Sequence, residues 1–325
     1  MSTVKSVAVS VELTGRGTTV ALVDRHGKVR HRLHAMTLRG RPAIATIEPP
    51  LRAIDTMLSH ALAEGFKVGG LGVCVPGTID FDRRRPLLLP TLPSLNDFPL
   101  CDFLEARYHL PVQLRIDVDA ALLGEHRFGA GKGVNRLLFL TLNAVVGVSL
   151  VVDGQLERTA QQYVGHISHL LVSTNGPRCS CGKRGCINTL VSADAMQKMV
   201  QRALRRGEQT SLTQRLLNRE CFSPQLLAEE AVRGDSVSLQ VYGEVGRWLG
   251  VATTRYIDLF EPHRLILGGD ALFAGDLLLD HVRRTLITRP SSSVCTMVDV
   301  VPAHLGRDAS IVGSVVPLFI SNAMI

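Results

Sequence analysis

Residues 169–186 read HLLVSTNGPRCSCGKRGC, a stretch with three cysteines in eight positions and a histidine ten residues before the first. Three thiolates and one imidazole are the donors of a closed tetrahedral zinc site, and the two glycines at 182 and 185 let the chain turn around an ion. Four protein ligands leave no position for water, so this zinc would be structural. The alternative is a loop with three unrelated thiols. The expected ligands are His169, Cys179, Cys181 and Cys186.

The composition is that of an ordinary globular protein. The chain has 325 residues, 46% apolar and 20% charged, so we expect a sizeable core in one two-lobed domain or in two domains. The net charge of +7 comes mostly from scattered arginines without interleaved aromatics, which favours a solvated surface over a nucleic-acid patch. No signal peptide or membrane-spanning run is visible, and the cytoplasm is the expected compartment. The cysteines outside the loop are predicted to be small core residues: Cys74, Cys101, Cys221 and Cys295.

Strands and helices alternate along the chain, which predicts a mixed α/β fold. A strand–turn–strand hairpin opens the chain at SVAVSVELTGRGTTVALVD (6–24), and apolar spacing predicts a helix over 43–64. A second block begins with RLLFLTLN (136–143) and VVGVSLVVDG (145–154), and it contains mostly helix over 190–245. Two blocks that each start with a hairpin predict two lobes with a cleft between them. We expect an N-terminal lobe of residues 1–118 with 306–325 and a C-terminal lobe of residues 119–305.

The cysteine loop resembles the signature of the ROK family, whose name stands for repressor, open reading frame and kinase. The family pattern G-E-x-G-H, then C-x-C-G-x-x-G-C-x-E, corresponds to VGHISH (164–169) and CSCGKRGCIN (179–188). Four further stretches resemble family blocks: VPGTID, LRIDVDAALLGE, FEPHRLILGGD and GRDASIVGSV. The resemblance covers nearly the whole chain. It implies a two-lobed, actin-like or hexokinase-type ATPase fold with sugar and nucleotide between the lobes.

By this resemblance, Asp117 is the aspartate that accepts the proton of a sugar hydroxyl or orients the hydroxyl. The residues alone equally allow a helix N-cap, a role open to Asp117 or Asp119. Where the family has sugar-binding glutamates, this chain has His166 and Asn188, and neither replaces a carboxylate that accepts two hydroxyls. The ligand therefore need not be an ordinary hexose. The candidate ligand-binding residues are Gly77, Thr91, His166, His169 and Asn188.

The two phosphate loops of the family's kinases are altered here. The D-x-G-G-T turn is replaced by ELTGRGTT, with Arg16 between its glycines and Ser10 or Glu12 as the nearest substitute for the aspartate. The G-T-G-x-G loop reads NAVVG at 143–147, and valine resists the backbone geometry that glycine allows. The nucleotide-side glycines persist as Gly268 and Gly269, where a turn after a buried strand is an equal explanation. These changes argue against ATP and magnesium as cofactors.

These observations favour a ROK protein that binds a sugar or sugar phosphate and signals through conformation, without kinase activity. It would be the effector-binding portion of a transcriptional regulator, or a stand-alone relative. The first alternative is an ATP-dependent, glucokinase-like sugar kinase with Asp117 as general base, and the second is a scaffold without a small-molecule ligand. Only about six residues precede the first strand, so no DNA contact is expected from this chain. Homo-oligomerisation is implied by the resemblance, and no membrane contact is expected.

Overall fold

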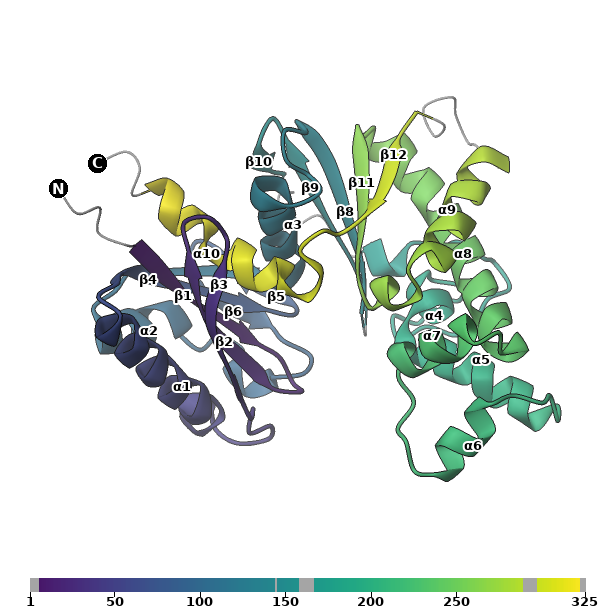
Figure 1. Ribbon diagram of the computed structural model, residues 1–325, viewed down its shortest axis with the longest axis horizontal. Coiled ribbons are helices and arrows are strands. Elements are labelled where there is room, and N and C mark those ends of the chain that lie inside the picture. The colour runs from purple at the N-terminus through teal and green to yellow at the C-terminus, as the bar shows by residue number, and fades with distance from the viewer. Residues whose placement is uncertain (1–5, 144, 158–166, 289–296, 322–325) are drawn as a thin grey trace. The chain divides into compact units, whose positions relative to one another are not determined.

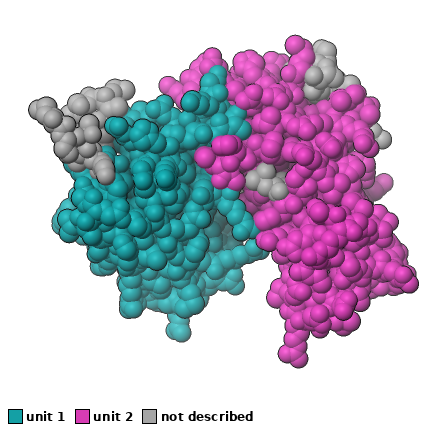
Figure 2. Space-filling model, viewed as in Figure 1, with its two compact units in different colours: residues 1–133, 158–163, 307–325 teal, residues 134–157, 164–306 magenta. Residues whose placement is uncertain are grey.

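The computed structural model describes residues 6–143, 145–157, 167–288 and 297–321, which belong to two compact units (Figures 1 and 2). Unit 1 comprises Met1–Gly133, Arg158–Tyr163 and Arg307–Ile325, and unit 2 comprises Val134–Glu157 and Val164–Gly306. Unit 1 continues past residue 118, the boundary expected from the sequence, because α3 (Asp117–Phe128) packs against α10 (Ala309–Ser321) of the same unit.

Unit 1 is built on a five-stranded mixed sheet in the order β3-β2-β1-β4-β7. The first three strands form an antiparallel meander, and β4 and β7 continue the sheet in parallel with β1. β1 and β2 have consecutive buried residues, such as Val7, Ala8 and Val9, because helices and the sheet interior leave them little solvent. The strands are β1 (Ser6–Leu13), β2 (Thr18–Asp24), β3 (Val29–Ala35), β4 (Lys67–Val75) and β7 (Val112–Ile116).

The helices of unit 1 cover this sheet. α1 (Ala43–Ala63) packs on β2 and β3, and α2 (Leu100–Tyr108) packs on β7, while β5 (Thr78–Asp80) and β6 (Arg85–Leu88) form a separate small hairpin. The C-terminal helix α10, yellow in Figure 1, packs on β1, β4 and α3. Its buried face completes the core beside a sheet whose strands all lie between Ser6 and Ile116. That face consists of Ile311, Val312, Val315 and Val316.

Unit 2 repeats the sheet of unit 1, with the strand order β10-β9-β8-β11-β12. An antiparallel meander again comes first, and β11 and β12 are again parallel to the first strand of the unit. The predicted repetition of a hairpin-led block is confirmed. The strands are β8 (Arg136–Leu142), β9 (Val146–Val152), β10 (Gln155–Leu156), β11 (Arg264–Gly269) and β12 (Asp299–Pro302).

Residues 190–245 are mainly helical, as the sequence predicted. The long helix α8 packs against α5, α7 and α9, and its buried tyrosines Tyr242 and Tyr256 fill the core of the unit. The helices are α4 (Asn188–Val191), α5 (Ala193–Arg205), α6 (Leu212–Leu217), α7 (Pro224–Val232), α8 (Ser236–Phe260) and α9 (Asp276–Thr288). No helix within the described ranges combines the length and apolar character that a membrane crossing requires.

The isolated cysteines divide into two kinds. Cys74 and Cys101 are buried, as predicted, but the prediction of a core position for Cys221 was wrong. Cys221 is exposed because it lies in the connection between α6 and α7. Cys295 lies outside the described residues.

Candidate functional site

Four side chains of unit 2 converge at the cysteine loop, as the sequence predicted. Their ligand atoms all lie within 4.8 Å of one another. Cys179 Sγ lies 3.3 Å from His169 Nδ1, and Cys181 Sγ lies 3.6 Å from Cys186 Sγ. Zinc–sulfur bonds of about 2.3 Å put the sulfurs of a tetrahedral site about 3.8 Å apart, so these spacings fit a four-coordinate metal ion. The cluster could therefore hold a metal.

The backbone of the loop is closed by its own hydrogen bonds. Cys179 N donates to Lys183 O at 2.8 Å, and Gly182 N donates to Cys179 O at 3.0 Å. Gly185 has φ +71°, and a Cβ there would lie 1.5 Å from Ser173 O, so only glycine fits at this position. The turn that brings the thiols together therefore depends on direct contact between two stretches of backbone.

In unit 1, Asp117 lies where β7 ends and α3 begins. It is the first residue of the helix, and the N-cap is Ile116, so neither Asp117 nor Asp119 is the N-cap that the sequence allowed. Asp117 Oδ1 accepts a hydrogen bond from Val118 N at 2.8 Å. Burial, together with the nearby charges of Glu12 and Asp119, raises the pKa of Asp117 to about 7. Asp117 is therefore a carboxyl group that titrates near neutral pH.

Glu12, on β1, is a second buried carboxyl group whose charge acts on Asp117. Ser310 Oγ donates to Glu12 Oε1 at 2.6 Å, and burial raises the pKa of Glu12 as well. Sequence reasoning considered Glu12 only as a substitute for a magnesium-binding aspartate, and it missed Ser310, which is 298 positions away.

The two other candidates of unit 1 differ in exposure and role. Gly77 follows β4, and a Cβ there would lie 2.3 Å from Leu88 O, so close packing accounts for this glycine. Thr91 is exposed and lies against the first hairpin turn, where a Cβ on Gly15 would be 2.5 Å from Thr91 Cβ. Thr91 thus has an accessible hydroxyl group beside the turn.

That turn, Thr14–Gly17, is closed by hydrogen bonds of its own. Gly17 N donates to Thr14 O at 3.3 Å, and Arg16 N donates to Thr14 Oγ1 at 3.2 Å. Thr14 N in turn donates to Gly17 O at 3.0 Å. The backbone amides of Thr14, Arg16 and Gly17 are therefore engaged within the turn, and the Arg16 side chain is exposed next to them.

Asn143, directly after β8, is fixed by a hydrogen bond to the segment after β11. Asn143 Oδ1 accepts from Asp270 N at 3.2 Å and occupies the space beside Gly269, where a Cβ would lie 2.4 Å from that oxygen. A Cβ on Gly268 would lie 2.5 Å from the ring of Phe139, so packing explains that glycine. The side chain of Asn143 thus fills the space beside Gly269, and the ring of Phe139 fills the space beside Gly268, the two glycines predicted for the nucleotide.

Asn188, predicted as a ligand residue, begins α4 directly after the cysteine loop. Its Oδ1 accepts from Val146 N at 3.1 Å, so it connects the cysteine loop to the β8–β9 loop. His169 is in the metal cluster, and the structure thus brings His169 and Asn188 together with this loop within unit 2. His166, the remaining candidate, lies outside the described residues.

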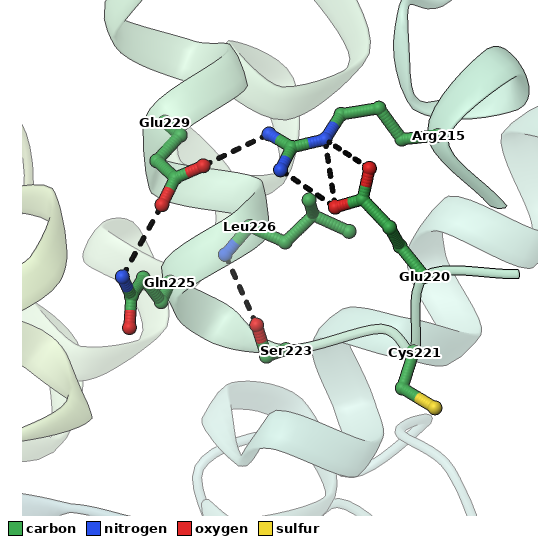
Figure 3. Close-up of a pocket in the computed structure, with 7 residues that line it drawn as sticks. All are labelled: Arg215, Glu220, Cys221, Ser223, Gln225, Leu226 and Glu229. Atoms are coloured by element: carbon green, nitrogen blue, oxygen red, sulfur yellow. Dashed lines mark hydrogen bonds and ion pairs between the residues drawn. The ribbon is translucent and has the colours of Figure 1, made fainter. Parts of the chain in front are cut away.

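A separate polar pocket in unit 2 is formed by α6, α7 and their connection (Figure 3). Arg215 is at its centre and pairs with Glu220 at 2.6 Å, Glu229 at 2.8 Å and Glu230 at 3.0 Å. Hydrogen bonds from Ser211 and then from Arg215 lower the pKa of the buried Glu230. Because three carboxylates surround one guanidinium, this pocket has no surplus positive charge for a ligand, and it serves to fix α6 onto α7.

Comparison with known proteins agrees with this geometry. The sequence model of the ROK family matches residues 8–318. Among curated proteins, a glucokinase of Thermotoga maritima is 29% identical over 94% of this chain and 95% of its own length. A xylose repressor of Bacillus spizizenii is 25% identical over 75% of this chain but only 59% of its own length. The chain thus spans little more than half of this repressor.

Solved structures have the same mixed α/β fold. A ROK family transcriptional regulator, described as a homologue of the E. coli MLC protein, superposes with a TM-score of 0.87 at 22% identity, over 98% of this chain and 78% of its own. A ROK family glucokinase from Streptomyces griseus, solved with glucose and AMPPNP, gives a TM-score of 0.80 at 27% identity, over 95% and 98% of the two chains. Regulators and kinases are both represented among the relatives.

Proposed function

The chain belongs to the ROK family, and from that premise we propose that it binds a sugar or sugar phosphate as a regulatory protein and does not transfer phosphate from ATP. The observation that carries this proposal is the state of the two phosphate loops. The turn Thr14–Gly17 uses three of its four backbone amides internally, and the side chain of Asn143 fills the space at Gly269. A kinase needs open backbone at such loops to hold and neutralise the phosphates.

The proposed metal is zinc, with a structural role. The donor set of one imidazole and three thiolates is the one zinc prefers, and the close spacing of its atoms fits tetrahedral coordination. With four protein ligands the ion would have no open position. It would hold the loop that begins at His169 and ends next to Asn188.

The proposed sugar contact in unit 1 is the carboxyl group of Asp117. A carboxyl group with a pKa of about 7 can either accept from or donate to a hydroxyl at neutral pH. In unit 2, the amide of Asn188 is the proposed contact, although its oxygen also accepts from Val146 N. Ligand binding at Asn188 would therefore act directly on the β8–β9 loop, which is a route from a ligand to a conformational response.

A glucokinase-like sugar kinase is the second candidate, and the pKa of Asp117 favours it. A general base works best with a pKa near the working pH, and Asp117 meets that condition. In that reaction Asp117 would take the proton of the sugar hydroxyl while the hydroxyl oxygen bonds to the γ-phosphorus of ATP and ADP leaves.

The two candidates are separated by measuring binding and turnover on the same protein. Sugars and sugar phosphates are screened by thermal shift with and without Mg-ATP, and each hit is then assayed for ADP release. The regulatory proposal expects a shift with a sugar or sugar phosphate and no ADP release. ADP release that is sugar-dependent and lost in Asp117→Asn would overturn it in favour of the kinase.

A further inference from the structure

A second cavity of unit 2, of about 530 Å³, lies between the cysteine loop and helix α5. Arg178 and Ser180 line it from the loop, and Lys198, Arg202 and Arg205 line it from the helix. The spacing of the three cationic residues on α5 puts them along one helix face. The opposite face of α5 is buried through residues such as Met196 and Val200. The helix therefore cannot rotate about its axis to move the cationic side chains out of the cavity.

The cavity has a marked excess of positive charge. Four cationic side chains face a single carboxylate, Asp194, which pairs with Lys198 at 2.5 Å. Arg202 Nε donates to Lys198 O at 3.3 Å, which leaves the rest of its guanidinium group for other partners. Arg178 and Arg205 form no ion pair with any carboxylate in the described part of the chain. This distinguishes the cavity from the other pocket, where Arg215 pairs with Glu220 and Glu229, both drawn in Figure 3, and also with Glu230.

A basic final turn is common in helices because it complements the helix dipole, and this accounts for Arg202 and Arg205. It does not account for Arg178, which reaches the same cavity from the other wall. Two arginines from opposite walls, with Ser180 also in the lining, form the kind of charged clamp that recognises phosphate groups. The volume suits a small metabolite rather than a macromolecule.

We propose that this cavity is a binding site for a small phosphorylated anion with at least two negative charges. Arg178 and Arg205 would contact its phosphate groups, and Lys198 and Arg202 would contribute to the attraction. The site shares Asn188 with the sugar contacts proposed above but does not include Asp117. Asn188 lies in the cavity wall and also holds Val146 N, so an anion here would act on the same β8–β9 loop.

The test is isothermal titration calorimetry, which measures the affinity of the metal-loaded protein for inorganic pyrophosphate at low and at moderate salt. The double variant Arg178→Gln with Arg205→Gln removes two charges from the cavity. The matched control, Arg184→Gln with Arg206→Gln, removes two charges from the same loop and the end of the same helix outside the cavity. Metal content and thermal stability of each variant are measured first, so that a misfolded loop is recognised.

We expect the cavity variant to weaken pyrophosphate binding at least about tenfold and the control to weaken it less than about twofold. Equal loss in both variants would overturn the proposal, because it would mean attraction to net charge alone. Absence of pyrophosphate binding at millimolar concentration in the unaltered protein would also overturn it. A third result would overturn it as well: the unaltered protein binds a DNA duplex or an acidic peptide but not pyrophosphate, and the cavity variant abolishes that binding.

Discussion

Gly185→Ala tests whether backbone contact within the cysteine loop positions the metal ligands. An alanine Cβ would begin 1.5 Å from Ser173 O, and contacts under 3.0 Å are not sustained, so the two strands of the loop must separate by at least about 1.5 Å. That separation breaks the bonds from Val172 N to Gly185 O, at 3.0 Å, and from Gly185 N to Pro177 O, at 2.9 Å. Two backbone hydrogen bonds at about 1 kcal/mol each, with about 1 kcal/mol for the left-handed backbone, give a cost of about 3 kcal/mol.

Gly182→Ala is the matched control, because Gly182 is also left-handed, at φ +87°, but a Cβ there meets nothing within 4 Å. Its cost should be the backbone strain alone, about 1 kcal/mol. For a unit of this size we expect melting temperatures about 6–12 °C lower for Gly185→Ala and about 2–4 °C lower for Gly182→Ala. Thermal unfolding and metal analysis of both variants provide the measurement. Equal losses of stability and equal metal content would refute the role assigned to the contact with Ser173.

Three further predictions follow from the described contacts. Burial raises the pKa of Asp117 to about 7, so the stability that this carboxyl group contributes is fully present below its ordinary pKa of 3.8 and is lost as the pH rises through about 7. The melting temperature of Asp117→Asn should therefore rise relative to that of the unaltered protein between pH 5 and pH 8. A constant difference between the two melting temperatures would contradict the raised pKa. Arg215→Met leaves the buried Glu230 with fewer partners and should cost about 2–3 kcal/mol in urea unfolding, whereas Arg206→Met, which breaks an exposed pair, should cost less than about 1 kcal/mol. Metal analysis should find about one zinc per chain, and removing it with a chelator should lower the melting temperature; an unchanged value would exclude a structural role for the ion.

The sequence predicted the elements of the fold well where short-range patterns determine them. The opening hairpin, the helix at 43–64 and the helical region after the cysteine loop each correspond to observed elements, because apolar periodicity and glycine turns are local properties. The metal cluster was predictable for the same reason, since three of its four ligands lie within one short turn.

Contacts between distant residues could not be predicted from local patterns. Nothing near Glu12 in the sequence indicates that Ser310 donates to it, and nothing near Asn188 indicates that it holds Val146 N. Gly268 illustrates the reverse case, because a glycine interpreted as a nucleotide contact is required by the ring of Phe139. Which side chain fills the space beside a glycine depends on the packed structure.

The packing of α10 has a consequence for folding during synthesis on the ribosome. Unit 1 includes Arg307–Ile325, which are translated only after the whole of unit 2 has been synthesised. The apolar faces of β1 and β4 that α10 covers therefore stay without this helix during the synthesis of more than half of the chain. A chain truncated after residue 306 should thus hold a protease-resistant unit 2 beside a cleavable unit 1, and the interval before α10 is available is when a chaperone would be needed.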